Sequence, residues 1–176
     1  MLHIKCDYTA VNLYPLSTHG MIENAKKILL ASHGTSGAQA AEQIVFKTCH
    51  RSAHVTHLVI VPIFWKNILG DDWLNNDVTR NRFCGYLEAE LENELNINLT
   101  RVRNHLKDRC ITNTNKILLG DPDRSLLETC ENYSYDLVVM GSPRPRSVAG
   151  LNSRMSTSLL TRELSTPLII APYPNA

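Results

Sequence analysis

The sequence lacks the features that mark several large classes of protein. No apolar run among its 176 residues approaches the length of a membrane-spanning helix. The segment from Met1 to Asp7 has no long apolar core of the kind found in a signal peptide. With 18 Lys and Arg residues against 17 Asp and Glu residues, the formal net charge is +1, which gives no case for a nucleic-acid-binding face or an acidic partner. We therefore expect a protein that binds neither a membrane nor a nucleic acid.

Cysteine pairs and familiar catalytic motifs are also missing. The five cysteines are scattered, with no Cys-x-x-Cys pair: Cys6, Cys49, Cys84, Cys110 and Cys130. An odd, dispersed set predicts reduced thiols in a cytoplasmic protein. There is no Walker A lysine, no Gly-x-Ser-x-Gly elbow and no catalytic Cys–His motif. His50, His54 and His57 lack the spacing of tetrahedral ligands, so no metal site is expected.

The remaining composition is that of an ordinary globular domain. Hydrophobic residues make up 43% of the chain and charged residues 20%, and this length can bury a core of adequate size. Residues 1–25 precede the first clear strand pattern, and we interpret them as an extended N-terminal arm whose role stays open. The domain itself is expected over residues 26–176.

Short, continuous apolar runs at 137–140 and 168–170 predict strands that are buried on both faces of a parallel sheet. Further strands are expected at 27–32, 57–61 and 116–119. Helical patterns separate them: one ends near Cys49, and another begins after Asp121, a suitable N-cap, with Pro122 as its first residue. The resulting class is α/β, with four strand–helix units and a closing strand.

The longest connection is the hardest part to interpret. Residues 62–82 show no period and contain both tryptophans, Trp65 and Trp73, whose role stays open. From Phe83 the apolar residues repeat at helical spacing. Whether this helix continues past Asn96 or breaks there cannot be decided from the pattern.

The last part of the chain contains the pattern on which a functional prediction depends. Gly141 follows a buried strand, a polar run leads to Thr157, a helical pattern reaches Glu163, and Pro167 opens the final strand. Ligands of open parallel sheets bind beyond the carboxyl ends of the strands, which is where this loop begins. Asn152 and Ser153 are predicted to cap the helix that follows.

This unit resembles the last unit of the universal stress protein family, in which a strand, a Gly-x2-Gly-x9-Gly-Ser/Thr loop, a helix and a proline-opened strand follow one another. Upstream, 27–35 resembles the family's first strand and turn, and 120–122 the loop after its third strand. The resemblance implies a doubly wound, five-stranded parallel sheet of order 3-2-1-4-5 with helices on both faces. The turn at His33 would then face the loop at Gly141.

The ligand loop departs from the family pattern. In nucleotide-binding members an Asp after the first strand contacts the nucleoside, and backbone N–H groups of the glycine loop wrap the phosphates. Aligned without gaps, Gly141 keeps the first glycine, and His33 stands in place of the Asp. The other two glycines fall on Arg144 and Arg154, and the serine that follows the last one falls on Met155. The candidate site implied by the resemblance comprises His33, Gly34, Val59, Met140, Gly141, Arg144, Arg154, Met155, Ser156 and Thr157.

Two interpretations of this loop stay open. The site has decayed, as in family members that do not bind ATP, or arginines have replaced bare backbone as permanently charged anion donors. A solvated basic loop is the alternative role of those arginines. Because Arg154 would fill the path of a triphosphate, we expect weak or absent ATP binding. A ligand with fewer phosphates, such as AMP, or an inorganic anion should be preferred.

We predict a universal stress protein-like stress-response protein that binds or regulates rather than catalyses, with no obligatory cofactor. Its ligand is expected to be AMP, ATP or another phosphorylated small molecule, whose identity the sequence does not give. The alternatives are a ligand-free regulator acting through protein partners, and a nucleotide-hydrolysing member of the related adenine nucleotide alpha-hydrolase-like superfamily. By resemblance, and because an apolar edge strand is a liability unless paired, a homodimer through Pro167 to Ala171 is expected.

Overall fold

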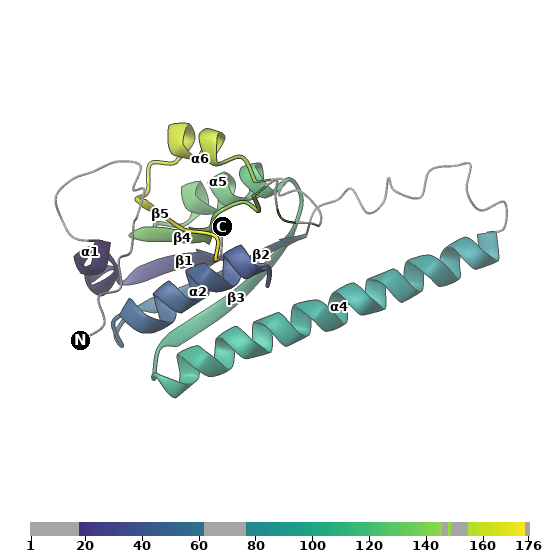
Figure 1. The fold of residues 1–176 in the computed structure, drawn as a ribbon, viewed down its shortest axis with the longest axis horizontal. Coiled ribbons are helices and arrows are strands. Elements are labelled where there is room, and N and C mark those ends of the chain that lie inside the picture. The colour runs from purple at the N-terminus through teal and green to yellow at the C-terminus, as the bar shows by residue number, and fades with distance from the viewer. Residues whose placement is uncertain (1–17, 62–76, 146–147, 149–154, 175–176) are drawn as a thin grey trace.

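The fold is a five-stranded parallel sheet covered by helices on both faces (Figure 1). The computed structural model describes residues 18–61, 77–145, 148 and 155–174. The strands are β1 (Lys27–Ala31), β2 (His54–Val61), β3 (Thr112–Leu119), β4 (Leu137–Gly141) and β5 (Leu168–Ala171). The helices are α1 (Thr18–Asn24), α2 (Ser36–Thr48), α4 (Asp77–Asp108), α5 (Pro122–Asn132) and α6 (Thr157–Glu163).

The strand order is β3-β2-β1-β4-β5, and every neighbouring pair is parallel. The predicted fold class and strand order are therefore confirmed. Two strands begin earlier than their apolar runs indicated, β2 at His54 and β3 at Thr112. In the described sheet β3 is an edge strand, and the polar residues at its start are exposed or half-buried. There His54 is 3.2 Å from the Thr112 hydroxyl and 2.9 Å from the Thr114 hydroxyl.

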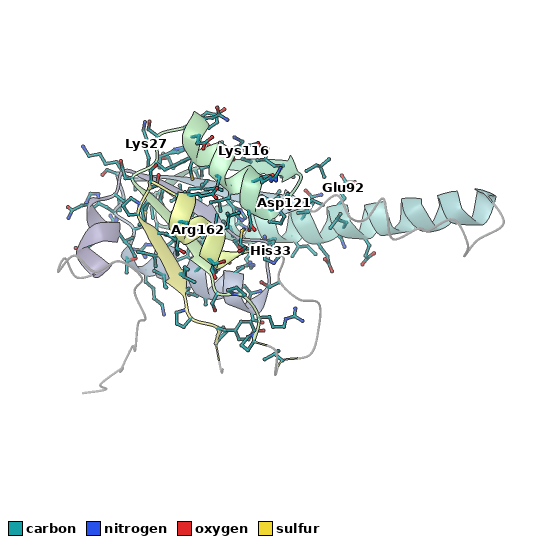
Figure 2. All side chains as sticks on the ribbon, turned by 90° about the horizontal axis from the view of Figure 1, so that it is seen from above. Lys27, His33, Glu92, Lys116, Asp121 and Arg162 are labelled. Carbon is teal, nitrogen blue, oxygen red and sulfur yellow. The ribbon has the colours of Figure 1, made fainter. Side chains whose placement is uncertain are left out.

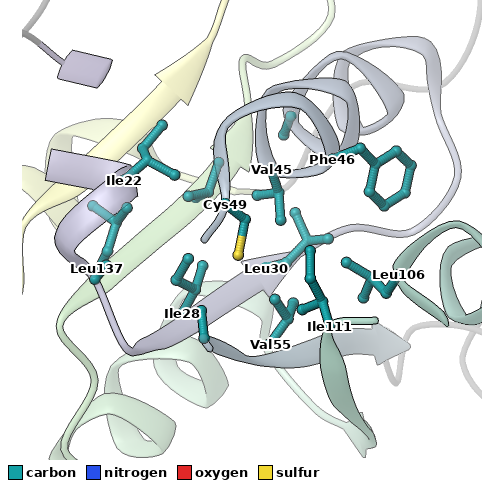
Figure 3. Close-up of a cluster of buried hydrophobic side chains, with 14 of the residues drawn as sticks. Ile22, Ile28, Leu30, Val45, Phe46, Cys49, Val55, Leu106, Ile111 and Leu137 are labelled. Atoms are coloured by element: carbon teal, nitrogen blue, oxygen red, sulfur yellow. The ribbon is translucent and has the colours of Figure 1, made fainter. Parts of the chain in front are cut away.

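Two core clusters lie on opposite faces of the sheet, because successive strand residues point to opposite sides. On the first face, Ile28, Leu30 and Val55 pack against α2 and α4 (Figure 3). On the second face, Leu29 and its neighbours pack against α5 and α6. All of these side chains are almost completely buried, which provides the main favourable term in folding.

Part of the segment expected to be an extended arm is instead packed helix. Residues 18–24 form α1, and Ile22, which is 1% exposed, joins the cluster beneath α2. The packed structure therefore includes residues before the first strand. Residues 1–17 lie outside the described part of the chain.

Helix α4 answers the question left open at Asn96, because it is continuous over 32 residues. Its C-terminal half packs through Leu99, Val102 and Leu106, all of them buried. Its N-terminal half extends beyond the sheet, with Glu92 on the extending part (Figure 2). Trp65 and Trp73 lie outside the described residues.

The N-cap predicted for α5 is present in the structure, and α6 begins at a different cap residue. Asp121 caps α5 by accepting hydrogen bonds from the amides of Asp123 (3.2 Å) and Arg124 (3.3 Å), as predicted. Helix α6 takes its N-cap from Ser156, whereas the expected cap residues, Asn152 and Ser153, lie outside the described residues. The Ser156 hydroxyl caps the helix by accepting a hydrogen bond of 3.4 Å from the amide of Leu159.

The part of the chain that the structure describes contains neither a disulfide nor a membrane-spanning helix. Cys49, Cys110 and Cys130, the cysteines whose side chains are described, are free thiols. Within the described ranges, no helix is both long and apolar enough to cross a membrane.

Candidate functional site

The carboxyl ends of β1 and β4 lie side by side, where the strand order reverses. Ala31 of β1 pairs with Met140 of β4, so the turn after β1 and the loop after β4 leave the same edge of the sheet. This edge is the position at which open parallel sheets bind ligands. The structure therefore brings His33 and Gly34 to the same edge as Gly141.

The turn after β1 is held by backbone and side-chain hydrogen bonds. The amide of Ser32 donates to the carbonyl of Leu58 at 3.1 Å. Gly34 has φ +85°, a conformation that favours glycine, and its carbonyl accepts a bond of 2.8 Å from the Gln39 side chain. His33 is exposed, with its Nε2 atom 3.5 Å from the Thr35 hydroxyl.

Gly141 owes its identity to packing as well as to its place in the loop. A Cβ atom on Gly141 would lie 2.1 Å from the carbonyl oxygen of Gly37, and one on Gly37 would lie 2.6 Å from that of Ser142. The two glycines thus let the first turn of α2 pack directly on the end of β4. The sequence pattern suggested only a role in phosphate approach, because the partner glycine is distant in the chain.

Helix α2 presents an uncapped N-terminus at this edge. Its N-cap residue, Thr35, makes no side-chain capping bond, and its first turn contains no acidic residue. The first amides of a helix have no partner within the helix and carry the positive end of its dipole. This end of α2 is therefore suited to an anion.

Ser142 is a polar residue of the site that the sequence analysis missed. Its amide donates to the carbonyl of Ala171 at 2.8 Å, which ties the loop to β5. Its hydroxyl is buried and has no hydrogen-bond partner among the described residues. Its position directly after a buried strand at the switch point was the signal that could have identified it.

At the start of α6 an acidic side chain already uses one of the amides. The amide of Ser156 donates to Asp123 Oδ1 at 2.7 Å, although Asp123 comes from α5. Burial raises the pKa of Asp123, while the Ser156 amide acts in the opposite direction. The loop before α6 therefore offers an anion fewer free donors than the sequence pattern suggested.

The other predicted residues differ in how they could contact a ligand. Val59 is 1% exposed and Met140 3% exposed, so both belong to the core. Arg144, Met155 and Thr157 are half-buried, and Met155 packs against the α5/α6 core cluster. Arg154 lies outside the described residues.

The charge state of His33 depends on opposing influences. The protein atoms around the ring lower its pKa below the ordinary value of 6.5 by desolvating the charged form, whereas nearby Glu42 raises it. Desolvation is the larger effect, so the neutral imidazole is favoured at neutral pH.

The three histidines considered as metal ligands are held apart in different environments. His50 Nδ1 lies 2.7 Å from the Ser52 hydroxyl, His54 contacts Thr112, and His57 is buried beside the carbonyl of Ser32. In the described ranges no three His, Cys, Asp or Glu side chains form a group that could hold a metal ion.

Comparison with known proteins identifies the fold through structure alone. No protein-family model matches the sequence, and no curated protein matches it at the sequence level. Hypothetical protein MJ0577 superposes with a TM-score of 0.64 at 18% identity, over 86% of this chain and 98% of that one. An AMP-bound universal stress protein family protein from Arabidopsis thaliana gives 0.55 at 11% identity, over 85% and 93% of the two chains.

A universal stress protein in complex with cAMP superposes with a TM-score of 0.54 at 17% identity, over 83% of this chain and 96% of that one. Each of these likenesses extends over most of both chains. At such low identity they show the fold alone, and that fold is the one of the universal stress proteins.

Proposed function

We propose that this chain, which has the universal stress protein fold, is a non-catalytic binding protein for a nucleotide with one phosphate, such as AMP. The observation that carries the proposal is the uncapped N-terminus of α2 beside the unpartnered hydroxyl of Ser142. Two structural neighbours, one with AMP and one with cAMP, support a ligand of this class.

The residues at the edge have complementary roles in this proposal. The first amides of α2 and the Ser142 hydroxyl donate to the phosphate, and Arg144 contributes a permanent positive charge. Neutral His33 hydrogen-bonds a sugar hydroxyl. Gly34 and Gly141 keep the backbone of the turn and of α2 in place through their conformation and packing.

The residues around the loop favour a ligand with one phosphate over a ligand with three. Arg144 and Met155 stand where the family pattern has a glycine and a serine, and Met155 packs into the core cluster. The carboxylate of Asp123 already accepts from the Ser156 amide. Additional phosphates would meet fewer amide donors and a nearby negative charge, so AMP should bind more tightly than ATP.

The proposed role is regulatory, in a stress response in the cytoplasm. No motif of the sequence supplies an activated nucleophile with its base, which disfavours the nucleotide-hydrolysing alternative. Steady release of phosphate from ATP would overturn the non-catalytic assignment. A ligand-free regulator is the second candidate, and the Asp123–Ser156 contact favours it because it removes a donor from the loop.

We also propose that the protein is a homodimer in which β5 pairs with its mate. Within the described sheet β5 pairs with β4 alone, which leaves an apolar edge exposed to association. Ile170 is half-buried against the α5/α6 core cluster, and Ile170→Lys should give folded monomers in sedimentation. Ile169 is less suitable because it is only 7% exposed. Thr161→Lys, on an exposed face of α6, is the matched control. A dimer that survives Ile170→Lys would contradict this interface.

The anion site can be tested by adding one negative charge at the N-terminus of either α2 or α6. Ser36→Asp adds a carboxylate to the first turn of α2, and Ser158→Asp adds the same charge to the first turn of α6; both positions are exposed. Calorimetry with AMP, ATP and inorganic phosphate should show AMP affinity reduced by about tenfold in Ser36→Asp only. Equal affinity in both variants would exclude the α2 site. Absence of binding by the unmodified protein would favour the ligand-free regulator.

A further inference from the structure

A buried polar network lies beneath the turn that follows β1, on the α2/α4 face of the sheet. Glu42 of α2 is fully buried. Its carboxylate accepts from the Ser32 hydroxyl and from both terminal nitrogens of Arg101 on α4, one of them at 3.0 Å. A buried carboxylate is tolerated only when it is paired in this way. The network therefore ties α2 and α4 to the end of β1.

Asn98 extends this network to the turn itself. Arg101 donates to Asn98 Oδ1 at 2.5 Å, so Nδ2 is the donor end of the amide. A Cβ atom placed on Gly34 would lie 3.5 Å from Asn98 Cγ, which puts this side chain directly against the turn. Asn98 is 6% exposed, and Nδ2 has no hydrogen-bond partner among the described residues.

His57 has a buried acceptor atom without a partner among the described residues, whereas the unpartnered atom of Asn98 is a donor. Its Nε2 atom lies 3.1 Å from the carbonyl oxygen of Ser32. A carbonyl can only accept, so Nε2 carries the proton and Nδ1 is left as an acceptor. The residue is fully buried, and Nδ1 has no partner in the described part of the chain. Burial, the largest influence, lowers the pKa of His57, as does Arg101, while the Ser32 carbonyl and Glu42 raise it.

His57 Nδ1 needs a donor and Asn98 Nδ2 needs an acceptor, and a hydroxyl group provides both, because it accepts through its oxygen and donates through its hydrogen. We propose that His57 Nδ1 and Asn98 Nδ2 form a subsite for one hydroxyl oxygen, supplied by a buried water or by the sugar of a bound nucleotide. Buried polar groups in native proteins almost always have a partner, and buried water commonly provides it. The water source stands apart from the proposed function, whereas the sugar source rests on it.

The subsite would give the turn a role in ligand recognition. Both atoms belong to side chains that contact the turn, His57 through the Ser32 carbonyl and Asn98 through Gly34. A hydroxyl between them would join β2 to α4 and hold the turn from below. The shape that the turn presents to a nucleotide then depends on this oxygen.

The existence of the subsite is tested on the unmodified protein. High-resolution crystal structures, with and without AMP, should show one oxygen within hydrogen-bond distance of both atoms in at least one of the two states. Nitrogen NMR of the His57 ring should show a proton on Nε2 and an accepting Nδ1. No oxygen in either state, two separate waters that each serve one atom, or a proton on Nδ1 would overturn the proposal.

The source of the hydroxyl is tested with Asn98→Asp, which keeps the acceptor for Arg101 and turns the donor into a second acceptor. A water molecule has two hydrogens and can donate to both the introduced carboxylate and His57, whereas a sugar hydroxyl has only one. If the sugar provides the hydroxyl, AMP affinity should fall about tenfold in this variant, and 2′-deoxy-AMP or 3′-deoxy-AMP should bind the unmodified protein equally weakly. Unchanged affinities assign the oxygen to water.

Asn96→Asp is the matched control, since it makes the same change at an exposed position of the same helix. If the unmodified protein binds no AMP at all, the proposed function fails, yet the ligand-free crystal structure and the ring NMR still decide the subsite. If Asn98→Asp does not fold, the deoxynucleotide comparison on the unmodified protein still identifies the source.

Discussion

The two faces of the sheet differ in the polarity of the side chains that they bury. Between the sheet and α5 and α6, the core cluster consists of apolar side chains such as Leu29, Leu126 and Leu160. The opposite face adds fully buried Glu42 and His57 to its apolar cluster. Apolar packing is non-directional, whereas a buried polar network fixes the orientation of every group that satisfies it. The polar network adjoins the turn of the candidate site, so the face that costs more to bury is the one that holds this turn in place.

Removing the cation of the network should have the largest effect on stability. Arg101→Met leaves the buried carboxylate of Glu42 without its positive partner, so the free energy of unfolding should fall by about 4 kcal/mol. Urea denaturation measures this, with Arg103→Met at an exposed position of the same helix as the control. Replacing both partners, Glu42→Leu with Arg101→Met, should recover most of the loss. Equal effects of the two arginine variants would contradict the description of this face.

A cavity on the apolar face should cost somewhat less. Leu126→Ala removes a fully buried side chain of α5 and should lower the free energy of unfolding by about 3 kcal/mol. Because the two sites lie on opposite sides of the sheet, the double variant with Arg101→Met should show additive losses to within about 0.5 kcal/mol. Strong non-additivity in urea denaturation would show that the faces are coupled.

Acid should weaken the polar face more than the apolar one. Burial holds the pKa of His57 below 6.5 in the folded protein, so the unfolded chain binds the proton more readily. Stability is therefore complete above the unfolded value and falls as the pH drops through 6.5 towards the folded one. His57→Gln should flatten the loss of stability between about pH 7.5 and pH 5.5, although Glu42 and Arg101 also face this ring. An unchanged slope in urea denaturation would refute this origin of the acid sensitivity.

A helix cap on the apolar side should give the smallest effect. Asp121→Ala removes the side chain that accepts from two amides of α5 and should lower the free energy of unfolding by about 1 kcal/mol. Glu128→Ala, at an exposed position in the middle of α5, is the control and should change stability little. A cap variant as stable as this control would mean that α5 is held by packing alone.

The sequence predicted the features that depend on neighbouring residues in the chain, and it missed those that depend on residues far apart in the chain. The presence of the five strands, the Asp121 cap and the end of α2 at Cys49 depend on neighbours in the chain, and all three were predicted. The starts of β2 and β3 were predicted too late in the chain. The Glu42–Arg101 pair joins residues 59 positions apart, and no local pattern indicates it. The continuity of α4 through Asn96 also depends on the tertiary contacts of its C-terminal half.

For the candidate site, the sequence predicted which segments lie together but not the contacts that their residues make. The resemblance predicted that the turn at His33 faces the loop at Gly141, and the pairing of β1 with β4 brings both to one edge of the sheet. It attributed Gly141 to phosphate binding, whereas the structure explains that glycine by the backbone of Gly37. The contact of Asp123 with Ser156 spans 33 positions, so the loss of that amide donor could not be inferred from the loop sequence.

Nucleotide binding at the carboxyl edge of the sheet is tested most directly by locating bound AMP through its effect on backbone amide NMR signals. We expect saturable shifts at the carboxyl edge, for Gly34, Gly37 and Ser142. At the amino edge, a cavity of about 470 Å³ lined by basic residues such as Arg51 and Arg109 provides the internal comparison, and its signals should stay unchanged. Shifts confined to that cavity, or no shifts anywhere, would contradict a nucleotide site at the carboxyl edge.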